Sequence, residues 1–175
     1  MDANVSPGPR ALVFGLVTLG TLAADLGTKR WAERALGEGS ESVTGALRFH
    51  LAKNPGGAGS FLRDAPDAVR IPFFFAATAL AVVAVFYFLR KLGPHQNAMR
   101  VALALVMGGA LGNLVDRVRY GYVIDFIDVH AAWRGSDVHW PTFNVADMAI
   151  CAGAALLALG ALRRGDKATL PAFRA

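Results

Sequence analysis

The chain has 175 residues, of which 54% are hydrophobic and only 18% are charged, and its mean hydropathy is +0.40. This composition excludes a disordered chain and differs from that of soluble domains, about a quarter of whose residues are charged. The single cysteine, Cys151, excludes an intrachain disulfide and a cysteine-based zinc finger. The net charge of +5 does not indicate nucleic acid, because the basic residues are scattered. We therefore expect a membrane protein with no nucleic-acid partner.

Four apolar stretches predict four membrane spans. The longest lies between Arg70 and Arg90, and its 19 uncharged residues would form a helix of roughly 28 Å, close to the thickness of the hydrocarbon core. The other three reach span length only when each extends past an aspartate. We expect one membrane-embedded domain over 1–175, with spans at about 11–31, 70–90, 99–118 and 143–163 and outward segments at about 33–69 and 119–142.

Three of the spans carry an aspartate at one end. When the spans alternate in direction, Asp25, Asp116 and Asp147 lie on the same side of the membrane at similar depth. A carboxylate at the centre of a membrane helix costs about 2.5–3.5 kcal/mol, and less toward the interface. Three such residues at one level indicate a shared polar site, although any one of them alone would be explained by a helix end facing water.

The density of basic residues indicates the orientation. Lysine and arginine are denser in the short segments on the side without these aspartates, which places both termini in the cytoplasm and the aspartates outside. A competing interpretation makes the first span a cleaved signal peptide, with Arg10 upstream and a cleavage site before Ala24. Against it, residues 25–32 continue the helical pattern without a break.

The outward segments differ in character. In 33–69, the stretches 42–44 and 47–51 alternate like strands, and Asn54-Pro55-Gly56-Gly57 is a strong turn signal, which predicts a small antiparallel sheet on the membrane surface. The segment 119–142 is rich in aromatic residues, as is typical of an interfacial segment. Within it, Asp125 stands between Ile124 and Phe126, and an acid flanked by apolar residues is usually paired or functional.

A metal site is not expected. His130 and His139, together with Asp128 or Asp137, match no compact ligand motif, and no cysteine assists them. No serine–histidine pairing is evident and no glycine-rich phosphate loop precedes a lysine, which leaves the acidic residues as candidates for chemistry. We expect no cofactor.

The acidic residues leave three functions open. Two neighbouring carboxylates share a proton, so one can activate a water while the other protonates a leaving amine, as in an aspartic protease. The same acids could instead line a proton or ion pathway. They could also serve a structural scaffold through salt bridges, in which Asp25 pairs with Lys29, and Asp116 with Arg117 or a neighbouring span. The acids in question are Asp25, Asp116, Asp125, Asp128 and Asp147.

Five sequence blocks, in order along most of the chain, resemble those of the lipoprotein signal peptidases, the type II signal peptidases of bacteria. The last three together are highly specific. One departure is Gly59, which stands where the family usually has an aromatic residue, with Phe61 two residues later. The blocks are Asp25-Leu26-Gly27-Thr28-Lys29, Asn54-Pro55-Gly56-Gly57-Ala58, Gly108 to Arg117, Gly121-Tyr122-Val123-Ile124-Asp125-Phe126 and Phe143-Asn144-Val145-Ala146-Asp147.

The resemblance implies the function and the site. The catalytic pair would be Asp125 and Asp147, and the residues near the substrate or supporting the pair would be Asn54, Gly56, Asn113, Arg117 and Asn144. We also count Asp25, Lys29 and Asp116 among the supporting residues. The substrate would be a prolipoprotein with a diacylglyceryl-modified cysteine, cut just before that cysteine. The expected fold is four transmembrane helices with a small antiparallel sheet and an interfacial segment on the outward side. We expect a monomer in the bacterial cytoplasmic (inner) membrane, in contact with lipid.

Overall fold

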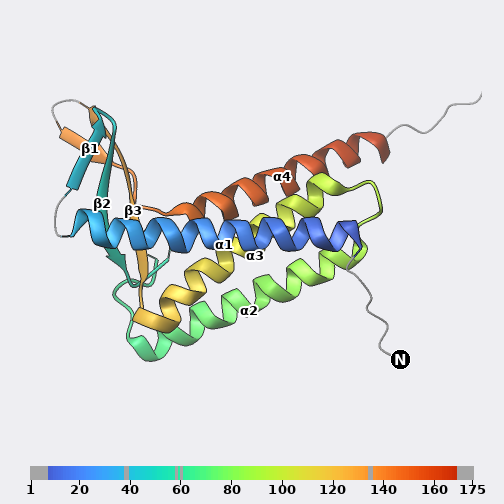
Figure 1. Cartoon of the computed structure of the whole chain (residues 1–175), viewed down its shortest axis with the longest axis horizontal. Coiled ribbons are helices and arrows are strands. Elements are labelled where there is room, and N and C mark those ends of the chain that lie inside the picture. Colours follow the sequence, from blue (N-terminus) through green and yellow to red (C-terminus); the bar gives the residue numbers. More distant parts are fainter. Residues whose placement is uncertain (1–7, 38–39, 58, 60, 134–135, 169–175) are drawn as a thin grey trace, which may run out of the picture.

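The computed structural model describes residues 8–37, 40–57, 59, 61–133 and 136–168. Four helices form an elongated bundle, and a four-stranded sheet lies at one end of it (Figure 1). The elements in chain order are α1 (Pro9–Leu36), β1 (Ser40–Thr44), β2 (Leu47–Asn54), α2 (Asp67–Lys91), α3 (Asn97–Tyr120), β3 (Val123–Trp133), β4 (Ser136–His139) and α4 (Val145–Ala168).

All four expected spans are helices long and apolar enough to cross a membrane. Within α2, which the structure describes in full, Val85 is the one buried residue. Leu80 and Val83 are 70% and 64% exposed, and a soluble protein would not leave a whole apolar helix in water. The exposed sides of the bundle therefore face lipid. α1 runs unbroken past Asp25, so the segment after that residue belongs to the same helix.

Helix α3 lies at the centre of the bundle and packs against α1, α2 and α4. Small residues allow this close approach. A Cβ atom on Gly108 would lie 2.6 Å from the Thr21 Cβ of α1, and one on Gly109 would lie 2.5 Å from the carbonyl oxygen of Ala146 in α4. Gly108 and Gly109, in the middle of α3, thus let this helix pack closely against α1 and α4.

The sheet has the order β1-β2-β3-β4, with every neighbouring pair antiparallel. The hairpin of β1 and β2 agrees with the strands expected in 33–69. The segment 119–142, expected to be interfacial, also forms strands, because β3 and β4 extend the sheet from β2 and Asp125 pairs with Ala52. An aromatic cluster joins the sheet to α1, with Trp31 and Phe126 centroids 6.1 Å apart and Trp31 and Phe49 centroids 5.2 Å apart.

Candidate active site

Two asparagines connect the carboxylates of Asp125 and Asp147. Asn144 donates from Nδ2 to Asp125 Oδ1 at 2.7 Å and from its backbone N–H to Asp147 Oδ2 at 3.2 Å. Asn113 of α3 donates to the other oxygen, Asp147 Oδ1, at 2.9 Å. A third bond, between Asn144 Nδ2 and Asn113 Oδ1, links the two amides at 3.2 Å. The start of β3 and the first turn of α4 are thereby held together around one polar centre.

The first turn of α4 fixes the position of Asp147. Asn144 precedes the helix, and its Oδ1 accepts from the Asp147 backbone N–H at 2.9 Å while Asp147 Oδ2 accepts from the Asn144 N–H. This reciprocal pair is a capping box, which satisfies N–H groups that have no partner within the helix. The three-residue spacing of Asn144 and Asp147 therefore has a local structural cause, and the same cap orients a carboxylate toward Asp125.

The turn after β2 supports the site from the other side. Asn54 donates from Nδ2 to Asp125 Oδ2 at 2.9 Å, and its Oδ1 accepts from the Gly56 N–H at 3.0 Å. Arg117 of α3 donates to the Gly56 carbonyl oxygen at 3.0 Å and lies 4.3 Å from the centre of the Phe74 ring. A Cβ atom on Gly56 would lie 2.5 Å from the Phe61 carbonyl oxygen, so a larger residue would displace this turn.

Beneath the pair lies a buried ionic cluster formed by Asp25, Lys29 and Asp116. The Lys29 ammonium is 2.8 Å from Asp25 Oδ2 and 2.8 Å from Asp116 Oδ2, and it donates to Asn113 Oδ1 at 3.0 Å. All three side chains are at most 3% exposed.

The second oxygen of Asp25 accepts from the Ala146 N–H at 2.9 Å. Asp116 Oδ2 also accepts from the Ile124 N–H at 3.1 Å. The expected pairing of Asp25 with Lys29 is confirmed, and Asp116 pairs with a neighbouring span, which was one of its two expected partners. The cluster thus ties α1 and α3 to the segments that carry Asp147 and Asp125.

The environment of Asp125 favours its protonated form. Burial, together with the nearby charge of Asp147, raises the pKa of Asp125 to about 7, despite the hydrogen bonds from Asn54 and Asn144. A carboxyl group with this pKa exchanges a proton near neutral pH, which is what general acid–base catalysis requires. The structure thus brings together a titrating acid and a second carboxylate, the arrangement expected for an aspartic protease.

A cavity of about 360 Å³ opens beside Asp125. Its wall includes the end of β2 and the segment that follows β4, with Lys53, Asn54, Trp140 and Thr142. Gly59, at the position where the family usually has an aromatic residue, also lines it and has a positive φ of 62°. Asp125 is one of the residues that line this cavity, so a peptide bound there would lie next to it.

A second polar cluster lies further along the sheet. Asp128 forms an ion pair with Arg48, and the Nδ1 atom of His139 lies 3.0 Å from Asp128 Oδ1. Burial alone would raise the pKa of Asp128, but the hydrogen bonds with His139 and Arg48 outweigh it and lower the pKa. His130 joins this group. The three residues come from two strands, so their spacing along the chain did not indicate that they lie together. The side chain of Asp137 lies outside the described residues.

Comparisons with known proteins identify the family of the chain. A family model described as signal peptidase (SPase) II matches residues 17–163. A lipoprotein signal peptidase of Geobacter sulfurreducens is 44% identical over 159 residues, which are 89% of this chain and 94% of that relative. One of Ralstonia nicotianae is 46% identical over 130 residues, which are 74% of this chain and 71% of that relative. A solved bacterial membrane enzyme is 28% identical, with a TM-score of 0.75 and coverage of 92% of this chain and 94% of its own. The chain belongs to the signal peptidase II family.

Proposed function

We propose that Asp125 and Asp147 are the catalytic pair with which this chain cleaves diacylglyceryl-modified prolipoproteins just before the lipidated cysteine. As a member of its family the chain is a multi-pass bacterial membrane protease that removes signal peptides from prolipoproteins. The observation that carries the assignment is the hydrogen-bonded bridge of Asn144 between the two carboxylates, beside an open cavity. The whole chain, 1–175, acts as one membrane-embedded domain.

The reaction follows from a proton shared between the two carboxyl groups. Asp147 takes a proton from water as the water oxygen attacks the scissile carbonyl carbon, and Asp125 donates its own proton to the carbonyl oxygen. In the second step the C–N bond breaks, Asp147 passes its proton to the leaving amine of the cysteine, and Asp125 recovers a proton from the hydroxyl of the new acid. Both groups return to their starting states, and no metal or cofactor enters the reaction.

The membrane would place the substrate at this site. Asp125 and Asp147 lie where the helices meet the sheet, so acyl chains dissolved between the spans would hold the lipidated cysteine at the depth of the pair. Binding energy from these remote chains would orient the scissile bond. Arg117 and the turn of Asn54 and Gly56 border the same site and would position the peptide backbone.

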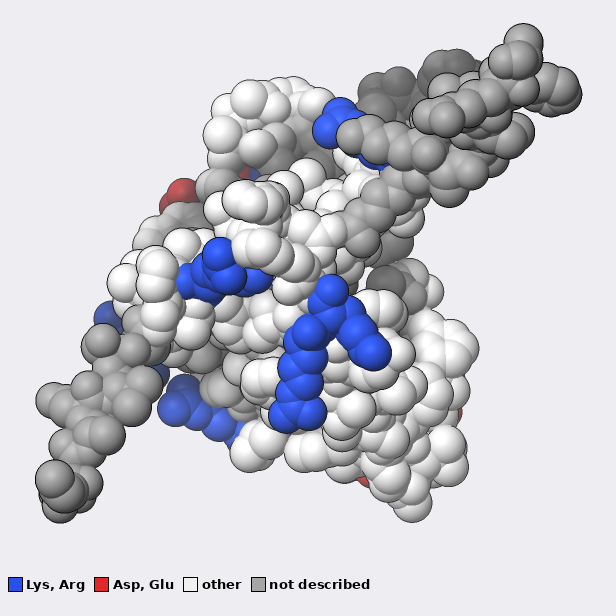
Figure 2. Space-filling view, turned by 90° about the vertical axis from the view of Figure 1, so that its right-hand side faces the viewer, with Lys and Arg blue, Asp and Glu red and all other residues white. Residues whose placement is uncertain are grey.

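The distribution of charge supports an outward-facing site and cytoplasmic termini. Basic side chains gather at the end of the bundle that lies away from the sheet, and few acidic ones are seen there (Figure 2). By the positive-inside rule that end faces the cytoplasm, and the sheet end faces outward. The described basic residues at the helix ends on that side are Arg10, Arg90, Lys91, Arg100 and Arg163. Nothing in this mechanism requires a second subunit, so a monomer suffices.

A proton or ion pathway fits the same acids less well. Asp25, Lys29 and Asp116 satisfy one another and nearby backbone N–H groups in a closed cluster. Groups that relay ions need access to water on both sides, whereas these side chains are at most 3% exposed. Their contacts are those of a structural support for the catalytic pair.

A cleavage assay tests the assignment. A diacylglyceryl-modified prolipoprotein in detergent or vesicles is incubated with the wild type and with the Asp125→Asn and Asp147→Asn variants. We expect both substitutions to abolish cleavage, and cleavage at the normal rate by either variant would disprove the pair. Asp64→Asn, on the exposed segment before α2, is the matched control and should cleave normally. Flux of protons into sealed vesicles that depends on Asp25 or Asp116 would favour the alternative.

A further inference from the structure

Strand geometry places Asp128, His130 and His139 on one face of the β3–β4 hairpin. Asp128 and His130 are two residues apart on β3, and side chains at this spacing point to the same side of a strand. His139 is the residue of β4 directly opposite His130 in the antiparallel register. Directly opposed residues bring their side chains to within contact distance. Asp128 and His130 on β3 and His139 on β4 therefore offer three potential metal ligands on one face of the hairpin.

The three side chains lie at distances that suit coordination of one ion. The rings of His130 and His139 stack with centroids 5.4 Å apart, and one ligand atom of each residue lies within 4.8 Å of the other two. His139 Nδ1 is 3.0 Å from Asp128 Oδ1 and 3.2 Å from Oδ2. Two ligands about 2.0–2.1 Å from a tetrahedral zinc ion lie roughly 3.3 Å apart, so this pair is already close to coordination geometry.

An unsatisfied nitrogen gives an independent indication of a ligand. The Nδ1 atom of His130 is buried and has no hydrogen-bond partner among the described residues. Leaving a buried polar atom without a partner is energetically unfavourable, so the atom requires an explanation. A cation bound between the two rings and the Asp128 carboxylate would supply the missing partner.

We propose that Asp128, His130 and His139 bind a divalent transition-metal ion of the zinc class, with water in the fourth position. One carboxylate and two imidazoles are ligands that such ions prefer. Arg48 holds Asp128 through one carboxylate oxygen, as groups behind metal ligands commonly do, and leaves Oδ1 facing His139.

Asp128 and His139 line the same cavity as Asp125, so the proposed metal site lies in the wall of the substrate cavity. Its effect would be structural, because it joins β4 to β3 at the wall of the cavity. His139 lines that cavity, and the next residues of the wall are Trp140 and Thr142. A bound ion would therefore hold this side of the substrate cavity in place.

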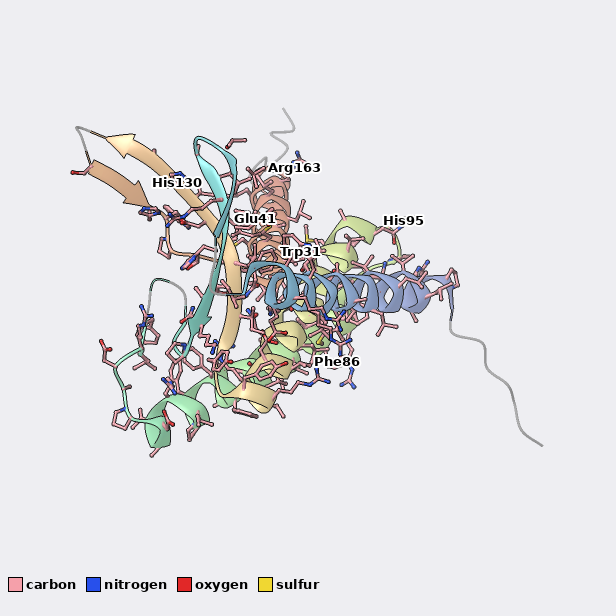
Figure 3. The ribbon with its side chains drawn as sticks, turned by 60° about the vertical axis from the view of Figure 1, so that its left-hand side comes forward. Trp31, Glu41, Phe86, His95, His130 and Arg163 are labelled. Carbon is pink, nitrogen blue, oxygen red and sulfur yellow. The ribbon has the colours of Figure 1, made fainter. Side chains whose placement is uncertain are left out.

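Metal titration tests the site without reference to activity. The full-length chain, purified in detergent without a histidine tag, is titrated with Co(II), whose visible absorption reports tetrahedral nitrogen and oxygen ligands, and Zn(II) is then added to displace it. The chain contains four histidines, and one of them lies away from the site. Figure 3 shows His130 on the sheet and His95 away from it, in the turn between α2 and α3, so His95→Gln is the matched control.

We expect one Co(II) per chain, displaced by Zn(II). His130→Gln and His139→Gln should each weaken binding by more than about 100-fold, since even residues behind a ligand cost 10–100-fold. His95→Gln should bind as the wild type does. Equal affinity of the wild type and the His130→Gln, His139→Gln double variant would overturn the proposal, as would an equal loss in His95→Gln. Circular dichroism establishes whether each variant is folded. If His130→Gln does not fold, His139→Gln tests the site, because the His139 side chain is 38% exposed and its replacement should disturb the fold less.

Discussion

Replacing Lys29 by methionine is expected to destabilise the chain severely, although Lys29 touches neither carboxylate of the proposed catalytic pair. The ammonium is 2% exposed and lies between the carboxylates of Asp25 and Asp116, at 2.8 Å from each. Methionine has a similar length and suits a membrane helix, so the change removes the charge and largely preserves the packing. Two carboxylates would then face each other in a buried site without a counter-charge.

The size of the effect follows from this burial. Removing one partner of a buried ion pair costs about 3–5 kcal/mol, because the remaining charge cannot be solvated. For a chain of this length each kcal/mol lowers the melting temperature by about 2–4 °C, so the expected decrease is about 6–20 °C. Neutralising both acids as well, in the variant Lys29→Met, Asp25→Asn, Asp116→Asn, should recover most of this loss, since no uncompensated charge is left.

The assay is thermal unfolding in detergent, followed by intrinsic fluorescence. Lys91→Met is the matched control, because Lys91 is exposed at the end of α2 and should change the melting temperature little. A decrease for Lys29→Met no larger than that of the control would refute the reasoning. So would a triple variant that is less stable than Lys29→Met alone, since the acids would then contribute through contacts other than charge.

Three further outcomes are expected. The rate constant kcat/KM should fall as the pH rises above about 7, because Asp125 then loses the proton that it donates, and a pH profile that stays flat across the alkaline range would contradict this. Asn144→Ala should lower the rate constant of single-turnover cleavage by roughly 10- to 100-fold, because it removes the hydrogen bonds that the Asn144 side chain makes with Asp125 and with the Asp147 N–H, and a wild-type rate constant would count against the bridging role. Gly109→Ala should cost about 1–3 kcal/mol in thermal unfolding, because the added Cβ would lie 2.5 Å from the Ala146 carbonyl oxygen. Gly15→Ala, with no atom within 4 Å, should be neutral or stabilise by up to about 1 kcal/mol, so equal melting temperatures of the two glycine variants would disagree with the packing analysis.

The helices were predictable from the sequence because a membrane span is a local property. Nineteen uncharged residues between Arg70 and Arg90 determine a helix that must satisfy its own backbone groups in lipid. The second half of the sheet was less predictable. The aromatic residues of 119–142 indicated an interface, whereas pairing of β3 with β2 depends on a strand more than seventy residues earlier, as the partners Ala52 and Asp125 show. Sheet partners at that separation leave no local signal.

Part of the proposed site was also local. Asn144 and Asp147 form a capping box whose three-residue spacing is visible in the sequence, and the pairing of Asp25 with Lys29 is one helical turn long. The bridge from Asn144 to Asp125 and the contact of Lys29 with Asp116 join different elements, so only the packed chain reveals them. These contacts explain why residues that touch no substrate belong to the site.

The sequence by itself determined the class of protein, because hydropathy and the motif blocks are read along the chain. It also indicated that the acids gather at one level, since each shortened span reaches full length only past its aspartate. Tertiary structure alone decided which acids face each other. It brought Asp125 beside Asn144, and it set Asp128, His130 and His139 together across two strands. The physical reason is that the interaction between charges and the sharing of a proton depend on the distance between groups in space. The packing of α3, α4 and the sheet fixes these distances.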